Sequence, residues 1–115
     1  AETRFTLPDA FAAALQYFRR FPDTDAAFCM SDTVALGVIR ALGDLGKRVP
    51  EDVSVMGVDG IEIGAYAVPR LSTVVQPIPE IARQTVDVLT DMLENGASAR
   101  HVTVPSRVEM RESVK

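Results

Sequence analysis

The stretch Val49-Pro-Glu-Asp-Val-Ser-Val-Met-Gly-Val-Asp-Gly60 carries the clearest structural signal in this chain of 115 residues. Its middle, Val53 to Val58, is a short apolar run rich in β-branched residues, which is typical of a strand buried in a parallel sheet. Such a strand delivers Asp59 to its carboxyl end. Because ligands of open α/β sheets bind in the crevice outside the carboxyl ends of the strands, Asp59 is the first candidate for a ligand contact.

Helical and extended segments alternate on both sides of this strand. Apolar residues at helical spacing predict helices over 8–20, 32–45 and 79–95. Apolar or alternating runs predict further strands over 26–30, 71–75 and 102–113. The run 26–30 has no polar alternation and is predicted to be buried on both faces, whereas the last strand, which contains Pro105, is predicted at an edge. The segment 61–68 has room for about two helical turns. This order predicts an α/β fold with a parallel sheet flanked by helices.

Composition excludes several classes of function. Sixteen acidic and 12 basic residues give a net charge of -4, which argues against DNA binding by this chain alone. The lone Cys29 cannot form an internal disulfide, and within an apolar strand it is expected to act as a small hydrophobe. No apolar run approaches the roughly 20 residues that span a bilayer. The first residue is Ala1 and not Met, which predicts that the sequence begins inside a longer chain.

Catalytic and cofactor motifs are missing from the sequence. His101 stands alone, and there is no Gly-x-Ser-x-Gly elbow, no Gly-x-Gly-x-x-Gly and no Walker loop. Asp32 and Asp59 alone would make a thin metal site, so neither a metal nor a cofactor is expected.

Polar side chains nevertheless follow each of the first three predicted strands. They are Ser31, Asp32, Asp59 and Gln76. Neighbouring parallel strands would bring these groups to one edge of the sheet, where carboxylates and amides can bind the hydroxyls of a sugar, a nucleoside or another polyol. A structural explanation stands beside this one, since Asp32 is suited to cap the helix that follows it and Asp59 to cap the segment 61–68.

Four phrases of the sequence, taken in order, carry a resemblance to a known family. They are Ala26-Ala-Phe-Cys-Met-Ser-Asp-Thr-Val-Ala-Leu-Gly37, Arg48-Val-Pro-Glu-Asp-Val-Ser-Val-Met-Gly-Val-Asp59, Pro69-Arg-Leu-Ser-Thr-Val-Val-Gln-Pro77 and Val104-Pro-Ser-Arg-Val-Glu-Met-Arg-Glu-Ser113. Together they resemble the C-terminal half of the lactose-repressor/galactose-repressor (LacI/GalR) family of bacterial transcription regulators. Four ordered motifs are far more specific than any one of them.

The resemblance implies a periplasmic-binding-protein-like domain of type I, of which this chain is a fragment, with two lobes and a small, sugar-like effector in the cleft between them. It implies effector contacts at Ser31, Asp32, Asp59 and Gln76. It also implies a division of the chain into the C-terminal lobe (1–76), a helix belonging to the N-terminal lobe (77–100) and a returning strand (101–115).

The resemblance further implies the partners of the protein. These would be the effector, a second copy of the chain bound around Leu36, Ile63 and Tyr66, and operator DNA held by an N-terminal helix-turn-helix that this chain lacks. The regulator would be cytoplasmic and would need no cofactor. Val58 and Gly60 replace an aromatic residue and an Asp that are common in the family, and Ser31 stands where Asn is common. These differences imply that the ligand cannot be inferred from that of a better-known member.

Two alternatives compete with a repressor. One is an exported sugar-binding protein that has the same fold and serves a transporter. The other is an α/β enzyme that uses Asp32 and Asp59 as general acid and base, which would require a raised pKa in one of them.

Overall fold

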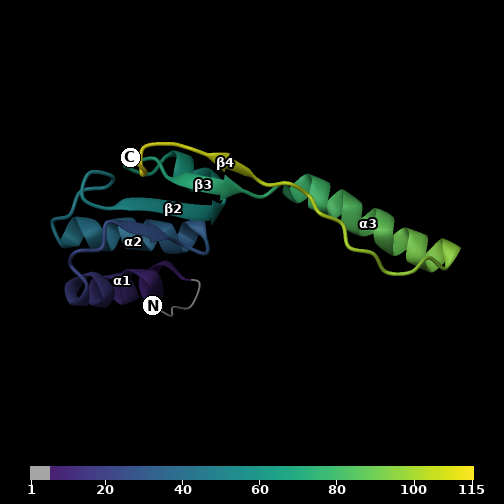
Figure 1. The fold of residues 1–115 in the computed structure, drawn as a ribbon, viewed down its shortest axis with the longest axis horizontal. Helices are drawn as coiled ribbons and strands as arrows, with labels where there is room; N and C mark the ends of the chain where they lie inside the picture. Colours follow the sequence, from purple (N-terminus) through teal and green to yellow (C-terminus); the bar gives the residue numbers. More distant parts are fainter. Residues whose placement is uncertain (1–5) are drawn as a thin grey trace. The chain divides into compact units, whose positions relative to one another are not determined.

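The computed structural model describes residues 6–115, and its elements follow the predicted alternation (Figure 1). They are α1 (Leu7–Arg20), β1 (Ala26–Phe28), α2 (Asp32–Asp44), β2 (Ser54–Asp59), the 3-10 helix η1 (Glu62–Ala65), β3 (Ser72–Val75), α3 (Ile78–Asn95) and β4 (Arg107–Glu109). These elements form two compact units. The first contains the described residues up to Val75 together with Val108–Lys115, and the second is Gln76–Arg107.

The sheet has the strand order β1-β2-β3-β4, and the pairs β1–β2 and β2–β3 are parallel. Phe28 pairs with Met56 in β2, and Asp59 pairs with Val75 at the end of β3. The carboxyl ends of these strands therefore lie at one edge of the sheet. β4 is an outer strand of the sheet, as the alternation across Pro105 predicts.

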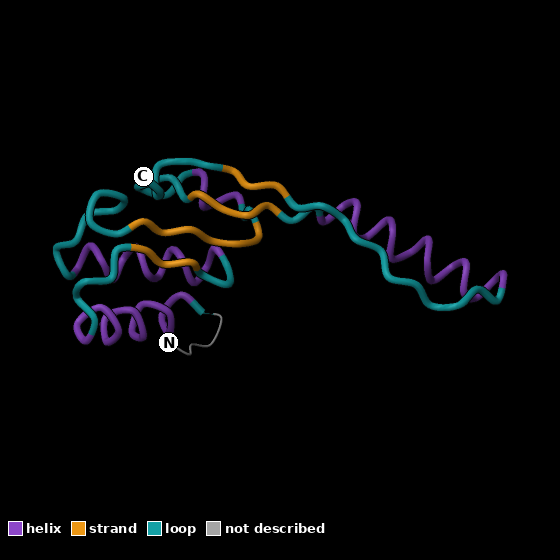
Figure 2. The backbone as a smooth tube through the Cα atoms, in the orientation of Figure 1, coloured by secondary structure: helices purple, strands orange, loops and turns teal. Residues whose placement is uncertain are grey.

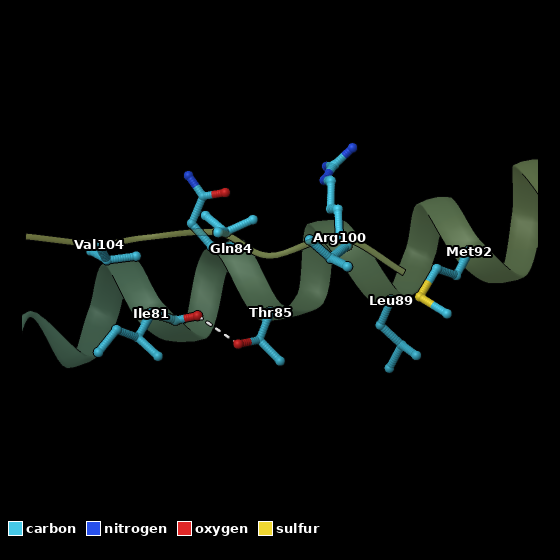
Figure 3. A pocket seen from close by; sticks show the side chains of 9 residues that line it. Ile81, Gln84, Thr85, Leu89, Met92, Arg100 and Val104 are labelled. Carbon is cyan, nitrogen blue, oxygen red and sulfur yellow. Dashed lines mark hydrogen bonds between the residues drawn. The ribbon is translucent and has the colours of Figure 1, made fainter. Parts of the chain in front are cut away.

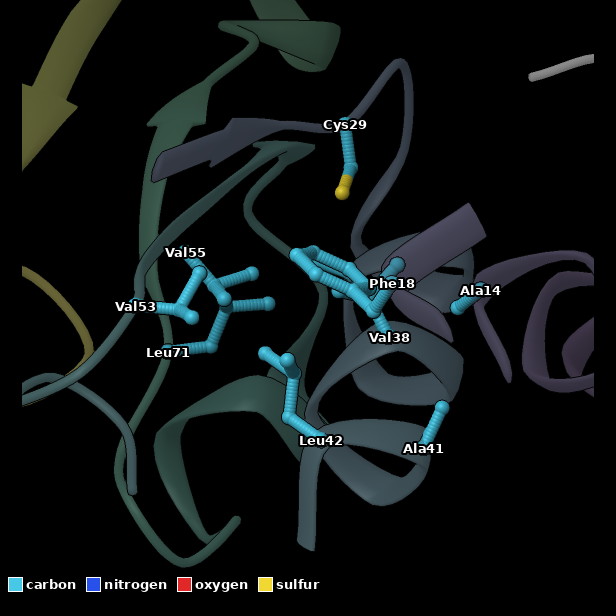
Figure 4. Packing of buried hydrophobic residues seen from close by; sticks show 10 residues of the cluster. Ala14, Phe18, Cys29, Val38, Ala41, Leu42, Val53, Val55 and Leu71 are labelled. Atoms are coloured by element: carbon cyan, nitrogen blue, oxygen red, sulfur yellow. The ribbon is translucent and has the colours of Figure 1, made fainter. Parts of the chain in front are cut away.

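The core of the first unit lies between the sheet and its two helices. α2 packs against β2, and α1 packs against α2. The apolar side chains that meet there are shown in Figure 4 and include Phe18, Cys29, Val38, Leu42, Val53, Val55 and Leu71. The expectation that Cys29 acts as a small hydrophobe is confirmed, because the side chain is buried and burial raises the pKa of its thiol to about 11. An α/β sheet flanked by helices is therefore the fold of this unit.

The last residues of the chain stabilise the same core through polar contacts. Ser113 is fully buried, and its Oγ accepts a hydrogen bond from the Ser72 amide at 2.8 Å and donates one to the Val55 carbonyl at 2.6 Å. Nearby, Glu112 accepts a hydrogen bond from the Arg70 amide and forms an exposed ion pair with the Arg70 guanidinium, and these two contacts hold the pKa of that carboxyl below its usual value. The C-terminal segment thus joins β2 to β3.

Three predictions about strands and helices are wrong. The last strand spans only Arg107–Glu109 and not the whole of 102–113. Ala26 and Phe28 are exposed, because only Ala27, on the opposite face of β1, packs against the core. The segment 61–68 forms only the short 3-10 helix Glu62–Ala65, because the chain turns back after it and the Leu71 amide donates a hydrogen bond to the Gly64 carbonyl at 2.8 Å.

The second unit consists of α3 and the extended segment that follows it (Figure 2). α3 ends at Gly96, whose φ of 66° lies in the left-handed region that glycine adopts without strain. No residue of α3 is buried. Its apolar side chains, including Ile81, Leu89 and Met92, line a shallow depression of about 540 Å³ together with Val102 and Val104 (Figure 3). Among residues 6–115, no helix is long and apolar enough to cross a membrane.

Candidate functional site

The candidate site is built around the buried carboxylate of Asp32, the first residue of α2. Its Oδ2 accepts two hydrogen bonds, from the backbone amides of Gly60 and Ile61, both at 2.8 Å. Its Oδ1 accepts a third, from the hydroxyl of Thr73 at 2.6 Å. The residue is 0% exposed, so these three donors replace the water that the carboxylate loses on burial.

The role predicted for Asp32 as a helix cap is wrong. Ser31 caps α2 instead, because its side-chain oxygen accepts the amide hydrogen of Val34 at 3.2 Å. Ser31 stands at the extended position before the first helical turn, where a short hydroxyl side chain reaches the free amides. Asp32 is thereby left to bond across the sheet to the turn after β2.

The carboxylate of Asp32 lies directly against the backbone of β2. A Cβ atom built on Gly57 would lie 2.2 Å from Asp32 Oδ1, which no real side chain could tolerate. A glycine inside a strand often marks such a close approach. Gly57 therefore permits the approach of α2 that brings Asp32 within bonding distance of both Thr73 and Gly60.

Asp59 lies at the carboxyl end of β2, in the turn that Asp32 holds. Its φ is 117°, an unfavourable backbone conformation for a residue with a side chain, and Gly60 follows with a φ of 77°. Such conformations persist when the surrounding structure holds them, and they concentrate at functional sites. Asp59 is partly exposed. The prediction that Asp59 caps a helix is wrong, because η1 begins after Ile61 and has no side-chain cap.

The structure brings three of the four predicted contact residues to one edge of the sheet. Ser31 and Asp32 follow β1, and Asp59 ends β2, which is the neighbouring strand. Ser31 is nearly buried, Asp32 is fully buried and Asp59 keeps some exposed surface. Gln76 follows Val75 in the chain and is the first residue of the second unit. Their contacts with a ligand remain predictions.

Thr73 is the residue of this cluster that sequence reasoning missed. A threonine within an apolar strand is an ordinary β-forming residue, so its type gave no signal. Gly57 did give one, because glycine inside a buried strand indicates that another group comes close. With the register of β2 and β3 known, Thr73 pairs with Gly57 and lies on the same side of the sheet as Asp32.

An apolar surface lies elsewhere on the first unit, over α2 and the segment after η1. Leu36, Ile39, Ala67 and Val68 line a depression of about 480 Å³ together with Arg40, Gly43 and Asp44. In the chain just before Ala67, Tyr66 is 78% exposed, and Ile63 in η1 is 62% exposed. Neighbouring exposed apolar side chains of this size are typical of a protein interaction surface. Leu36, Ile63 and Tyr66 are the residues predicted at the dimer interface, and that role remains a prediction.

The side chains described here offer little to a metal ion. In the part of the chain that the structure describes, no group of three or more His, Cys, Asp and Glu side chains converges on a point. The polar groups at the sheet edge are suited instead to neutral hydroxyl groups, which a carboxylate such as Asp59 binds as an acceptor.

Comparisons with known proteins agree with this fold. The family described as periplasmic binding protein-like domain matches residues 1–114. The uncharacterized HTH-type transcriptional regulator YvdE of Bacillus subtilis (strain 168) is 45% identical over 93 residues, which cover 79% of this chain and 29% of that protein. A LacI family transcriptional regulator from Arthrobacter sp. FB24, in complex with lactose, is 34% identical with a TM-score of 0.88, covering 98% of this chain and 44% of the other.

A second similar structure is that of the dimeric Lac repressor with an 11-residue C-terminal deletion. It is 26% identical with a TM-score of 0.87, and the match covers 95% of this chain and 40% of that chain. The fold and the ordered motifs define a ligand-binding domain of the periplasmic-binding-protein type. The chain belongs to the periplasmic binding protein-like domain family, and within it to the LacI/GalR regulators. It spans less than a third of the length of the Bacillus regulator.

Proposed function

We propose that this chain is the effector-binding and dimerisation part of a cytoplasmic bacterial transcription repressor that responds to a small, sugar-like ligand. The observation that carries the proposal is the turn at Asp59, which Asp32 holds in a strained conformation with two hydrogen bonds. Strain of this kind at the carboxyl end of a parallel strand is expected where a side chain must meet a ligand. Ser31 and Gln76 would contribute further contacts.

The effector would act by differential affinity. In the intact regulator a second lobe would close over the ligand, and a ligand that binds the closed arrangement more tightly shifts the population toward it. DNA-binding heads attached to the N-terminal side would then change their affinity for the operator by the same coupling free energy. This chain would perform no chemistry, which is consistent with relatives that are regulators.

Similarity to a regulator in complex with lactose supports a sugar ligand, and similarity to HTH-type regulators favours a repressor over an exported binding protein. The dimeric Lac repressor supports the proposal of a homodimer. The exposed Ile63 and Tyr66, with Leu36 beside them, would form the contact between the two copies.

The test is a thermal-shift screen of the full-length protein against lactose, other sugars, sugar phosphates and nucleosides, because a ligand that binds only the native state raises the midpoint of unfolding. With a ligand in hand, Asp59→Ala should weaken binding by about 10- to 100-fold, the usual contribution of a hydrogen bond to a charged group. Asp23→Ala, at an exposed position in the loop after α1, is the matched control. Equal affinities of the two variants would refute the role of Asp59.

The dimer contact is tested separately by sedimentation of the full-length protein. Ile63→Asp and Tyr66→Asp place a charge on the apolar surface and should shift the protein toward monomer. Met110→Asp changes an exposed apolar residue outside this surface and should not. If all three variants remain dimeric, the interface lies elsewhere.

A further inference from the structure

We propose that Thr73 is a positioning residue of the effector site: by bonding to Asp32 it holds the turn that presents Asp59. The inference rests on the proposed function only for the consequence on ligand binding. Its structural basis is one chain of contacts, from the Thr73 hydroxyl to Asp32 Oδ1 at 2.6 Å and from Asp32 Oδ2 to the Gly60 and Ile61 amides at 2.8 Å.

The hydroxyl of Thr73 determines which way the carboxylate of Asp32 faces. Thr73 and Asp32 are both 0% exposed, so water is not available to replace the bond. On the side of Oδ1, a Cβ atom on Gly57 would lie only 2.2 Å away, so residue 57 can bring no donor side chain of its own to this oxygen. Without the hydroxyl, Oδ1 would be a buried acceptor without a partner, and the carboxylate would rotate or shift to recover one. Either movement takes Oδ2 away from the two amides.

The turn itself has a strained backbone, which its hydrogen bonds and its pairing with β3 hold in place. Asp59 has a φ of 117°, which a residue with a Cβ leaves readily when its restraints are removed. Gly60, the next residue, has no room for a side chain, because a Cβ atom built on it would lie 2.9 Å from Val75 Cγ1. The bonds to Asp32 are therefore the restraint that Thr73 controls, and Asp59 is the side chain that moves when they are lost.

The chain supplies matched variants for a test. Thr73→Val keeps the shape of the side chain and removes the hydroxyl, whereas Thr73→Ser keeps the hydroxyl. Ser72→Ala is the control, because Ser72 is an equally buried hydroxyl in β3 whose Oγ accepts from the Arg111 amide and not from the Asp59 turn.

The first measurement is amide hydrogen exchange, by NMR, on the 115-residue chain and needs no ligand. Thr73→Val should accelerate exchange at Gly60 and Ile61 by about tenfold or more relative to the Cys29 amide, which bonds to the Met56 carbonyl of β2, because local opening of the turn becomes easier than opening of the sheet. Thr73→Ser should restore the slow exchange, and Ser72→Ala should leave these two amides unchanged relative to Cys29. An equal acceleration at all three amides in Thr73→Val, or no change at any, would overturn the proposal.

The second measurement is the affinity of the full-length protein for lactose, the ligand of the related Arthrobacter complex. Thr73→Val should weaken lactose binding by about tenfold, which is the effect expected from the loss of one hydrogen bond to a charged group. Thr73→Ser should bind lactose nearly as tightly as the unmodified protein. Unchanged affinity in Thr73→Val, with Asp59→Ala impaired, would refute the link from Thr73 to binding. If the unmodified protein does not bind lactose, the sugar proposal fails for this ligand, and the exchange rates still decide whether Thr73 holds the turn.

Discussion

α1 and α3 are both amphipathic helices with a clear apolar stripe, yet only one of them has its stripe covered. In α1, Ala10, Ala14 and Phe18 are buried against the neighbouring helix and the sheet. In α3 no residue is buried, and Leu89 keeps 54% of its surface exposed. The two sequences predict helices equally well.

The difference teaches that periodicity reports the existence of an apolar face and not the identity of what covers it. α1 is followed after five residues by a strand of its own unit and packs beside α2, whereas α3 lies in a unit whose only other described part is an extended segment. Most helical stability in proteins comes from tertiary packing of the apolar face. Stability within this chain should therefore be concentrated in the first unit.

The sharpest test of that asymmetry is a pair of leucine truncations. Leu42→Ala removes a fully buried side chain from α2 and should lower the free energy of unfolding by about 2 to 5 kcal/mol, through lost transfer energy and the cavity left behind. Leu89→Ala on α3 should change it by less than about 0.5 kcal/mol. Urea unfolding of the 115-residue chain measures both. Similar losses in the two variants would mean that α3 packs in solution.

A smaller effect is expected from the buried hydroxyl that closes the first unit. Ser113→Ala leaves the Ser72 amide and the Val55 carbonyl without their side-chain partner and should cost about 1 to 3 kcal/mol. Ser106→Ala, at an exposed position in the second unit, should be neutral. Urea unfolding measures both variants. An unchanged free energy of unfolding in Ser113→Ala would show that the C-terminal segment does not stabilise the sheet.

The helix starts extend the comparison, because Ser31 caps α2 whereas α3 begins after Pro77 with no side-chain cap. Ser31→Ala should cost about 1 kcal/mol, the usual value for a lost cap, and Ser31→Asp should recover most of it. Thermal unfolding followed by circular dichroism provides the measurement. A lower midpoint in Ser31→Asp than in Ser31→Ala would mean that Ser31 serves something other than the cap.

The smallest effect concerns charge on α3, where Arg83 bonds to Glu80 and lowers the pKa of that carboxyl from 4.5 to about 2. Because the folded pKa is the lower one, this pair stabilises the helix above pH 4.5, and its contribution disappears as the pH falls toward 2. Arg83→Gln should return the pKa of Glu80 toward its ordinary value, which an NMR pH titration detects. The two side chains lie at the surface, 58% and 42% exposed, so global stability should barely change.

Much of the fold could be predicted from the sequence because the signals are local. The ends of α2 and α3 follow from Ser31, Gly46 and Gly96, and β2 follows from a run of β-branched residues. The exposure of β1 could not be predicted in this way, since an apolar run shows that a strand favours burial and not whether a neighbour is present.

In the candidate site, too, local signals are found in the sequence and long-range contacts are not. The motifs identify Asp32 and Asp59, but the partners of Asp32 come from two other parts of the chain. Thr73 lies 41 residues away from Asp32, and Gly60 lies 28 residues away. Propensity explains neither bond, because each depends on the register of β2 and β3. A local rule therefore predicts that Asp32 caps α2, whereas in the structure the neighbouring Ser31 caps it.

The hydrogen bond from Ser113 to Val55 has a consequence for folding during synthesis. It joins residues 58 positions apart, and between them the chain leaves the first unit and returns to it. A ribosome releases residues in order, so β2 and β3 emerge well before the hydroxyl that joins them. Non-local contacts of this kind slow folding and leave strand edges open for longer. During synthesis the half-built sheet would be the part of the nascent chain most in need of a chaperone.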